Sequence, residues 1–216
     1  QNKFFIFDVE TTGLPPKGRK YATYRDTDHW PRIVQISWCV TEDLKENINV
    51  IHDAVIKPQG FTIPQESSDI HRITQEIANR DGLELRDVVL SEIKKDLEGC
   101  THVVAHNLSF DSSIFLCELY RMKENCLIAQ FASLKQVCTK NIATPYCKLR
   151  PFRYGSFKWP TLNELYYVLE NKIMDSEKAH NSKYDVEILI YCFQGLIERG
   201  LVDGIVYKNT RSGLLY

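Results

Sequence analysis

The sequence has no pair of closely spaced cysteines, although seven cysteines are spread through its 216 residues. The nearest two are nine residues apart, so no C-x-x-C motif occurs, and the number of cysteines is odd. These features argue against a zinc site and against a disulfide framework. We therefore expect free thiols and an intracellular, reducing compartment, either the cytoplasm or the nucleus.

Long hydrophobic runs and a strong charge imbalance are also missing. No apolar stretch approaches the length of a membrane span, and no charged and apolar leader precedes the first apolar run. The formal net charge is −1, so binding to nucleic acid would depend on local clusters of basic residues. No linker, repeat or low-complexity segment divides the chain. We expect a single domain over residues 1–216, without a membrane partner.

The hydrophobic pattern predicts an α/β fold with a mixed β-sheet flanked by helices. Strands are predicted at residues 3–9, 33–40, 49–56 and 102–106, and the short gap at 41–48 favours an antiparallel hairpin. Helices are predicted at residues 85–97, 109–122 and 161–169, and between Ser182 as N-cap and Gly200. Residues 131–158 are predicted as a strand followed by a long loop, and residues 14–31 as an unusually long polar loop.

Two carboxylates at the end of the first predicted strand, Asp8 and Glu10, are the strongest chemical signal. They follow four apolar residues and are separated only by Val9, so on a strand both side chains point to the same face. No lysine or arginine within this run can neutralise their repulsion. Their oxygens are suited to a hard divalent cation such as Mg²⁺ or Mn²⁺, and we predict a metal site there.

Three further candidates lie where a predicted strand ends or a predicted helix begins. Asp111 falls in a first helical turn, and His180 and Asp185 lie on either side of the start of the last helix. Taken singly, each has an ordinary structural explanation, because acids are favoured in first turns and in capping boxes. Combined with the first pair, they make four acids and one histidine. That set suits phosphodiester hydrolysis with two metal ions and a histidine base.

These three motifs, in this order, resemble those of the DEDDh branch of the DnaQ-like 3′-to-5′ exonucleases, which have the RNase H-like fold. The first motif is matched by residues 7–13, the second by residues 105–111 and the third by residues 180–185. His71-Arg72-Ile73-Thr74 is also similar to a segment of the polymerase-proofreading members. A sister branch has a tyrosine where this chain has Asn181, so the histidine branch is the better match.

The resemblance implies roles for individual residues and for their partners. The implied ligands of two Mg²⁺ or Mn²⁺ ions are Asp8, Glu10, Asp111 and Asp185, with Asp111 acting directly or through water. His180 would be the general base. The implied substrate contacts are Thr11, Thr12, Leu14, His106, Asn107 and Phe110, with Leu14 wedged against the terminal base. The implied partner is nucleic acid with a free 3′ end, and the likeness to proofreading members points to a polymerase or repair partner.

A basic and aromatic stretch between residues 135 and 159 is a candidate surface for the substrate. It contains six basic residues, no acidic residue and five interleaved aromatic residues. Basic side chains can follow phosphates while aromatic rings stack on bases. The alternative is a solvated basic loop whose aromatic residues anchor it to the core. We favour a substrate role for part of the stretch, with Arg150 and Arg153 as candidates.

Two other functions fit part of the pattern. Residues 8–12 resemble the start of phosphatases with an aspartate nucleophile, but the second motif differs from theirs. An inactive nucleic-acid-binding module would have lost metal-binding acids, whereas all four are present. The leading prediction is release of nucleoside monophosphates from 3′ ends, single-stranded or frayed. DNA is favoured by the proofreading resemblance, and an exoribonuclease of the same fold is the alternative.

Overall fold

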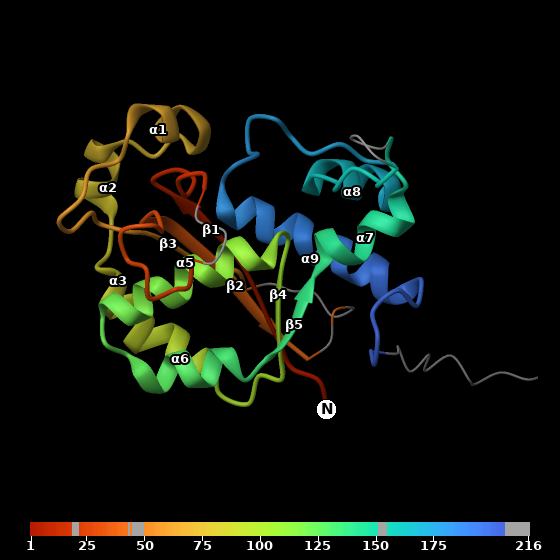
Figure 1. Cartoon of the computed structure of the whole chain (residues 1–216), viewed down its shortest axis with the longest axis horizontal. Coiled ribbons are helices and arrows are strands. Elements are labelled where there is room, and N and C mark those ends of the chain that lie inside the picture. The colour runs from red at the N-terminus through yellow and green to blue at the C-terminus, as the bar shows by residue number, and fades with distance from the viewer. Residues whose placement is uncertain (19–21, 43, 45–49, 151–154, 206–216) are drawn as a thin grey trace, which may run out of the picture.

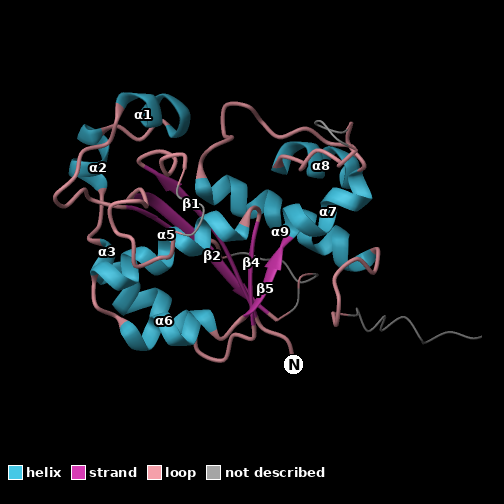
Figure 2. Cartoon of the chain, viewed as in Figure 1, coloured by secondary structure: helices cyan, strands magenta, loops and turns pink. Residues whose placement is uncertain are grey.

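A five-stranded mixed sheet forms the centre of the protein in the computed structural model, which describes residues 1–18, 22–42, 44, 50–150 and 155–205 (Figures 1 and 2). In spatial order its strands are β3(His52–Val55), β2(Ile33–Thr41), β1(Phe4–Thr11), β4(His102–Ala105) and β5(Lys135–Cys138). β1 is antiparallel to β2 and parallel to β4, while β2 and β3 form the predicted antiparallel pair. The mixed sheet predicted from the sequence is therefore confirmed, with β1 at its centre.

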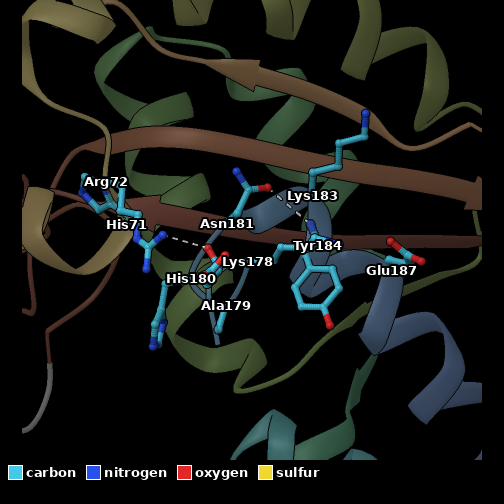
Figure 3. A pocket seen from close by; sticks show the side chains of 10 residues that line it. His71, Arg72, Lys178, Ala179, His180, Asn181, Lys183, Tyr184 and Glu187 are labelled. Atoms are coloured by element: carbon cyan, nitrogen blue, oxygen red, sulfur yellow. Dashed lines mark hydrogen bonds between the residues drawn. The ribbon is translucent and has the colours of Figure 1, made fainter. Parts of the chain in front are cut away.

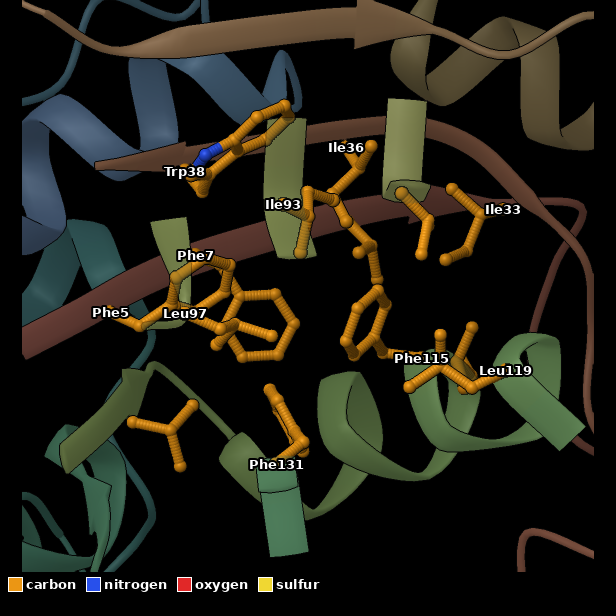
Figure 4. Packing of buried hydrophobic residues seen from close by; sticks show 14 of the residues in the cluster. Phe5, Phe7, Ile33, Ile36, Trp38, Ile93, Leu97, Phe115, Leu119 and Phe131 are labelled. Atoms are coloured by element: carbon orange, nitrogen blue, oxygen red, sulfur yellow. The ribbon is translucent and has the colours of Figure 1, made fainter. Parts of the chain in front are cut away.

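The side chains of β1 alternate between two hydrophobic clusters, one on each face of the sheet. Phe5, Phe7 and Val9 are buried in the cluster drawn in Figure 4. That cluster is covered by α3(Leu85–Val88), the π-helical turn η1(Val89–Ile93), α5(Leu108–Arg121) and α6(Asn125–Ala132). Phe4 and Ile6 pack on the other face, with residues of α8(Leu162–Glu170) and α9(Ser182–Glu198).

This alternation determines where the first two carboxylates lie. Burying a phenylalanine side chain stabilises a fold by about 1.5–3 kcal/mol, so the aromatic residues of β1 fix its register against both layers. A slip by one residue would move every side chain to the opposite face. Asp8 and Glu10 continue the series of Phe4 and Ile6, and they therefore lie on the face that α9 covers.

The helix predicted over residues 85–97 is present and contains one π-helical turn. It comprises α3, η1 and α4(Lys94–Asp96) in direct succession. Val88, Val89, Ile93 and Leu97 are buried against the sheet, as the apolar periodicity predicts. Gly99 follows with a φ of 73°, a left-handed conformation that glycine adopts without strain, and it ends the helix.

Four helices were not predicted from the sequence, and one of them, α6, extends into the start of the region predicted as a strand from residue 131. α1(Gln65–His71) and α2(Gln75–Asp81) have seven residues each and few buried side chains, so they carry little amphipathic signal. α7(Thr139–Cys147) occupies the start of the region predicted as a long loop after β5, and that part of the prediction is wrong. Pro145 lies inside α7 and conceals its helical pattern, because proline normally ends a helix.

The remaining elements follow the predictions more closely. The third strand is shorter than residues 49–56, because β3 begins at His52, and residue 49 lies outside the described residues. α8 has the predicted capping box, in which Thr161 and Glu164 bond each other's backbone N–H groups. Residues 12–18 and 22–32 contain no helix or strand, in agreement with the predicted polar loop.

This loop is tied to α5 by a buried carboxylate, Glu118, of which 1% is exposed. The Arg32 guanidinium donates to Glu118 at 2.8 and 3.2 Å, and the Arg121 guanidinium lies 3.1 Å from the same carboxylate. Arg121 also donates to the carbonyl oxygens of Thr27 and Trp30. The loop therefore returns to β2 along a fixed path, directly beside the end of β1.

All seven cysteines are free thiols, and no helix among the described residues combines the length and apolar composition needed to cross a bilayer. The predicted compartment stays a prediction. A single domain over residues 1–216 also stays a prediction, and residues 206–216 lie outside the described part of the chain.

Candidate active site

Four carboxylates and one histidine, all predicted from the three motifs, meet at the end of β1. Asp8 and Glu10 lie on β1, Asp111 lies in the first turn of α5, and Asp185 lies in the first turn of α9. The charges of Asp111 and Asp185 act on both carboxyl groups of β1. One ligand atom from each of Glu10, His180 and Asp185 lies within 4.8 Å of the other two. We call these five residues the carboxylate cluster.

Burial raises the pKa of all four carboxyl groups, and repulsion by neighbouring acids adds to this rise for Asp8, Glu10 and Asp111. Burial, followed by the charges of Asp185 and Asp111, raises the pKa of Glu10 to about 9. Burial raises the pKa of Asp111 to about 8 and that of Asp185 to about 7. Burial and its three acidic neighbours raise the pKa of Asp8 well above its usual value. Without a cation the cluster therefore retains protons at neutral pH.

The donor set fits a divalent cation. Asp185 Oδ1 is buried and has no hydrogen-bond donor among the described residues. Within the same part of the chain, no lysine, arginine or histidine forms a salt bridge with any of the four acids. Buried carboxylates in proteins are normally paired or bound to metal. Oxygen-rich sites of this kind suit Mg²⁺ and Mn²⁺, with the imidazole as an additional candidate ligand.

Two buried polar residues of β2 hold the start of α9 against the sheet. Gln35 Oε1 accepts a hydrogen bond from the Ser182 backbone N–H at 3.1 Å. The hydroxyl groups of Ser37 and Ser182 are hydrogen-bonded at 2.6 Å, and both side chains are completely buried. Ser37 is paired with Asp8 across β1 and β2. These bonds fix the first turn of α9, and with it Asp185, beside the carboxylates of β1.

The sequence did not indicate this supporting layer, and it assigned the wrong N-cap to α9. The N-cap is Asn181, whose Oδ1 accepts from the Tyr184 N–H, so neither Ser182 as N-cap nor a capping box of Ser182 with Asp185 is present. The backbone N–H and the hydroxyl group of Ser182 are instead hydrogen-bonded to Gln35 and Ser37 of β2. The sequence feature that could indicate this supporting layer is the polar pair Gln35 and Ser37, which lie two residues apart among the apolar residues of β2.

The predicted substrate contacts after β1 form a tight turn beside the cluster. Thr11 Oγ1 donates to the Gly13 carbonyl oxygen at 2.7 Å. The Thr12 N–H donates to the Arg32 carbonyl, and Thr12 Oγ1 accepts from the Arg32 N–H, each at 3.0 Å. Because the Arg32 side chain is bonded to Glu118, the contacts of Glu118 also help to hold this turn. Leu14 follows with 83% of its surface exposed, and its contact with a terminal base stays a prediction.

The second-motif residues are engaged with the protein. The two ring nitrogens of His106 are each 2.9 Å from a partner, Thr139 Oγ1 and the Pro160 carbonyl oxygen. Burial lowers the pKa of His106 to about 4, so the ring is neutral. Since a carbonyl only accepts, Nε2 donates to Pro160 and Nδ1 accepts from Thr139.

Asn107 and Phe110 also contact other parts of the protein. Asn107 Oδ1 accepts from Lys140 Nζ at 2.6 Å, and Phe110 packs on the core cluster of Figure 4. Direct contact of these two residues and His106 with substrate stays a prediction.

A cavity of about 350 Å³ lies beside His180 (Figure 3). One wall is formed by His71 and Arg72 at the end of α1, and another by residues between 177 and 187, in the segment before α9 and in its first turns. The Arg72 guanidinium bridges the two walls by donating to the Glu177 carbonyl oxygen at 3.0 Å. The segment beginning at His71, which resembles one in proofreading exonucleases, therefore faces the third motif across this cavity.

A mixed sheet with four acids and a histidine at the end of its central strand defines the class of DnaQ-like 3′-to-5′ exonucleases. The exonuclease family RNase_T matches residues 5–193, and the chain belongs to this family. No curated protein is similar enough to be identified as a relative. The predicted family and RNase H-like fold are confirmed, and the alternative of an aspartate-nucleophile phosphatase is wrong.

Solved structures of exonuclease I share this fold. The zinc-bound complex of Escherichia coli exonuclease I with single-stranded DNA has a TM-score of 0.64 and 18% identity, over 92% of this chain and 41% of that chain. Exonuclease I from Methylocaldum szegediense has a TM-score of 0.64 and 20% identity, with the same coverage. Another Escherichia coli structure contains a dT13 oligonucleotide and has a TM-score of 0.65 and 17% identity, over 92% of this chain and 41% of that chain. This chain spans less than half the length of these proteins.

The raised carboxyl pKa values predict that the metal-free protein loses stability as pH rises. Unfolded carboxyl groups titrate near pH 4, whereas the folded pKa values of Asp185, Asp111 and Glu10 are about 7, 8 and 9. Between these limits the unfolded state binds fewer protons, and each uncompensated proton lowers the free energy of unfolding by about 1.4 kcal/mol per pH unit. For a chain of this size, each such proton lowers the Tm by roughly 3–6 °C per pH unit.

Thermal unfolding in EDTA across this pH range measures the fall in Tm. The same pH series in Mg²⁺ shows how metal binding changes it. Metal ions bind the deprotonated carboxylates, so Mg²⁺ should raise the Tm more at alkaline than at acidic pH. A metal-free Tm that is constant or rises between pH 5 and pH 8 would contradict the raised pKa values.

Proposed function

We propose that this chain removes nucleotides one at a time from the 3′ end of single-stranded nucleic acid, with DNA as the preferred substrate. The observation that carries this proposal is the carboxylate cluster, in which a histidine lies within 4.8 Å of two acids that have no cationic partner among the described residues. Complexes of exonuclease I with single-stranded DNA and with dT13 support a single DNA strand as substrate. RNA is the second candidate.

The four acids would hold two divalent cations, Mg²⁺ or Mn²⁺. When bound, such ions act as Lewis acids that stabilise the charge on the attacking and leaving oxygens. Asp8, Glu10 and Asp185 present their carboxylates from the sheet and from α9, and Asp111 completes the set from α5. The bonds from Gln35 and Ser37 to Ser182 hold this arrangement before substrate arrives, so little reorganisation accompanies binding.

His180 would act as the general base. It is exposed at the start of α9, where its ring can reach a water molecule next to Glu10 and Asp185. The imidazole takes a proton from the water, whose oxygen forms a new bond to the terminal phosphorus. The bond from phosphorus to the 3′ oxygen of the preceding nucleotide breaks, and that oxygen takes up a proton from solvent water. The products are a new 3′ hydroxyl and a nucleoside 5′-monophosphate.

The turn after β1 would receive the terminal nucleotide. Thr12 is held by the backbone of Arg32, Thr11 bonds the Gly13 carbonyl oxygen, and Leu14 is mostly exposed to solvent. A leucine in that position can pack on the last base and separate it from the next one. A polymerase or repair partner would deliver such ends, as the likeness to proofreading members implies.

The proposal is tested with 5′-labelled single-stranded DNA, single-stranded RNA and duplex DNA in Mg²⁺ or Mn²⁺. We expect a ladder that shortens from the 3′ end of single-stranded DNA and that disappears in EDTA. Faster shortening of RNA would make the exoribonuclease the better description. Absence of cleavage of all three substrates by the intact protein would overturn the proposal.

A further inference from the structure

We propose that Lys140 and Trp159 form a second binding surface for the substrate strand, which holds a nucleotide upstream of the one being removed. Lys140 Nζ lies 4.3 Å from the centre of the Trp159 ring, and 65% of the Trp159 surface is exposed. We call this pair the Lys140–Trp159 platform. The inference rests on the proposed function, because it names how the same site would hold a strand rather than a mononucleotide.

The platform is connected to the carboxylate cluster through the second motif. Lys140 Nζ donates to Asn107 Oδ1 at 2.6 Å, and Asn107 is the N-cap residue of α5, which carries Asp111 in its first turn. The positive charge of Lys140 also acts to lower the pKa of Asp111. A phosphate bound to Lys140 would therefore lie close to the cluster, along a continuous strand.

His106 fixes both halves of the platform. Its ring nitrogens bond Thr139, the neighbour of Lys140 at the start of α7, and Pro160, the neighbour of Trp159. Thr139 and Pro160 lie 21 residues apart in the sequence, and one neutral, partly buried imidazole bonds both of them. This arrangement gives the second-motif residues His106 and Asn107 a positioning role toward the strand.

The chemistry of the pair suits a nucleotide. A lysine has three N–H donors, and Lys140 uses one for Asn107, so further donors remain for phosphate oxygens. A tryptophan that served only to anchor its loop would be buried, since burial is what makes an aromatic anchor stabilising. Trp159 is instead mostly exposed, and Phe157 in the same segment is 42% exposed. Exposed rings beside basic groups are how single strands are held without sequence preference.

The other basic residues of this stretch contribute less to the argument. Lys158 is paired with Glu164 at 2.5 Å, so its charge is already compensated. Of the two arginines predicted as candidates, Arg150 is exposed and Arg153 lies outside the described residues. The inference therefore concerns Lys140 and Trp159 alone.

Two substrates of different length distinguish binding at the platform from catalysis at the carboxylate cluster. The p-nitrophenyl ester of thymidine 5′-monophosphate occupies only the cluster, whereas a DNA strand of about 12 nucleotides also reaches the platform. We expect Trp159→Ala to raise KM for the strand about tenfold and to leave kcat and KM for the ester unchanged. Trp159→Phe should retain much of the affinity, because a phenyl ring still stacks. Tyr167→Ala, which removes another exposed aromatic side chain, is the matched control.

Binding of the same labelled strand in EDTA, measured by fluorescence anisotropy, provides a readout that needs no turnover. We expect Lys140→Met to lower the slope of log affinity against log salt by about 0.7, the value for one phosphate contact on a single strand. An unchanged KM and unchanged strand affinity in Trp159→Ala would overturn the inference, and so would an equal loss on the ester. If the intact protein cleaves neither substrate, the proposed function fails, but strand binding by the two variants still decides on the platform.

Discussion

Asparagine in place of Asp8 is expected to lower kcat by about 10³-fold or more, the largest effect we predict for a single side chain. Metal ions contribute several kcal/mol of transition-state stabilisation in two-metal sites, and each 1.4 kcal/mol corresponds to about a factor of ten in rate. An amide at position 8 keeps the shape of the side chain but loses the charge that binds a cation. The rate of 3′-end shortening at saturating Mg²⁺ measures this loss.

The same substitution is expected to stabilise the metal-free fold. Burial, together with Asp111, Glu10 and Asp185, raises the pKa of Asp8, which means that its charge is unfavourable there without a cation. A neutral amide removes this repulsion, and a gain of about 1 kcal/mol would raise the Tm in EDTA by roughly 2–4 °C at neutral pH. Opposite changes in activity and stability are the signature of a metal ligand, because a merely structural residue would lose both.

Asp81→Asn is the matched control, since Asp81 is exposed and, within the part of the chain that the structure describes, pairs only with the neighbouring Arg80. Exposed ion pairs contribute about 0–1 kcal/mol, so neither kcat nor the Tm should change appreciably. Wild-type turnover in Asp8→Asn would remove Asp8 from the metal site. A lower metal-free Tm would contradict the repulsion within the cluster.

The local parts of the site could be predicted from the sequence because their signals are local. The alternation of β1 places Asp8 and Glu10 on one face, and the two helix starts place Asp111 and Asp185 at the edge of the sheet. Period-two and period-3.6 patterns need only a few neighbouring residues to be visible. Local patterns alone therefore predict that these four carboxylates gather at one edge of the sheet.

The supporting contacts could not be predicted because they join residues that are distant in the chain. Ser37 and Ser182 are 145 residues apart, and Arg32 and Glu118 are 86 apart, yet each pair is hydrogen-bonded. Ser182 shows why such long-range contacts cannot be predicted from local patterns. Next to a helix start a serine is most simply interpreted as a cap, and only the buried polar groups of β2 show that its hydroxyl is used elsewhere.

The helices α1, α2 and α7 escape prediction for a different reason. α1, α2 and α7 bury few side chains, so tertiary contacts rather than amphipathic pattern determine them. Their position has consequences for function, since α1 supplies a wall of the cavity beside His180 and α7 carries Lys140. The substrate side of the protein is therefore the part that sequence patterns describe least well.

Replacing His180 with asparagine is expected to lower kcat by about 10²–10⁴-fold, the usual contribution of a general base. The geometry allows a second role, because a ligand atom of His180 lies within 4.8 Å of atoms from Glu10 and Asp185, as a metal ligand would. The two roles differ in their effect on metal affinity. A base can be lost while the four carboxylates still bind cations, whereas the loss of a ligand weakens binding directly.

Two measurements on His180→Asn separate these roles. The rise in Tm on addition of Mg²⁺ reports metal binding, and we expect it to match that of the intact protein. Added imidazole should restore part of the turnover, because His180 is exposed and a free base can reach the position of its ring. His52→Asn, which removes a partly exposed histidine stacked on Trp38, is the control and should keep full activity. Unchanged turnover would exclude His180 from the mechanism. A diminished Mg²⁺ effect on the Tm would make it a metal ligand, and the proton acceptor would then be sought among the carboxylates whose raised pKa values suit them to accept a proton near neutral pH.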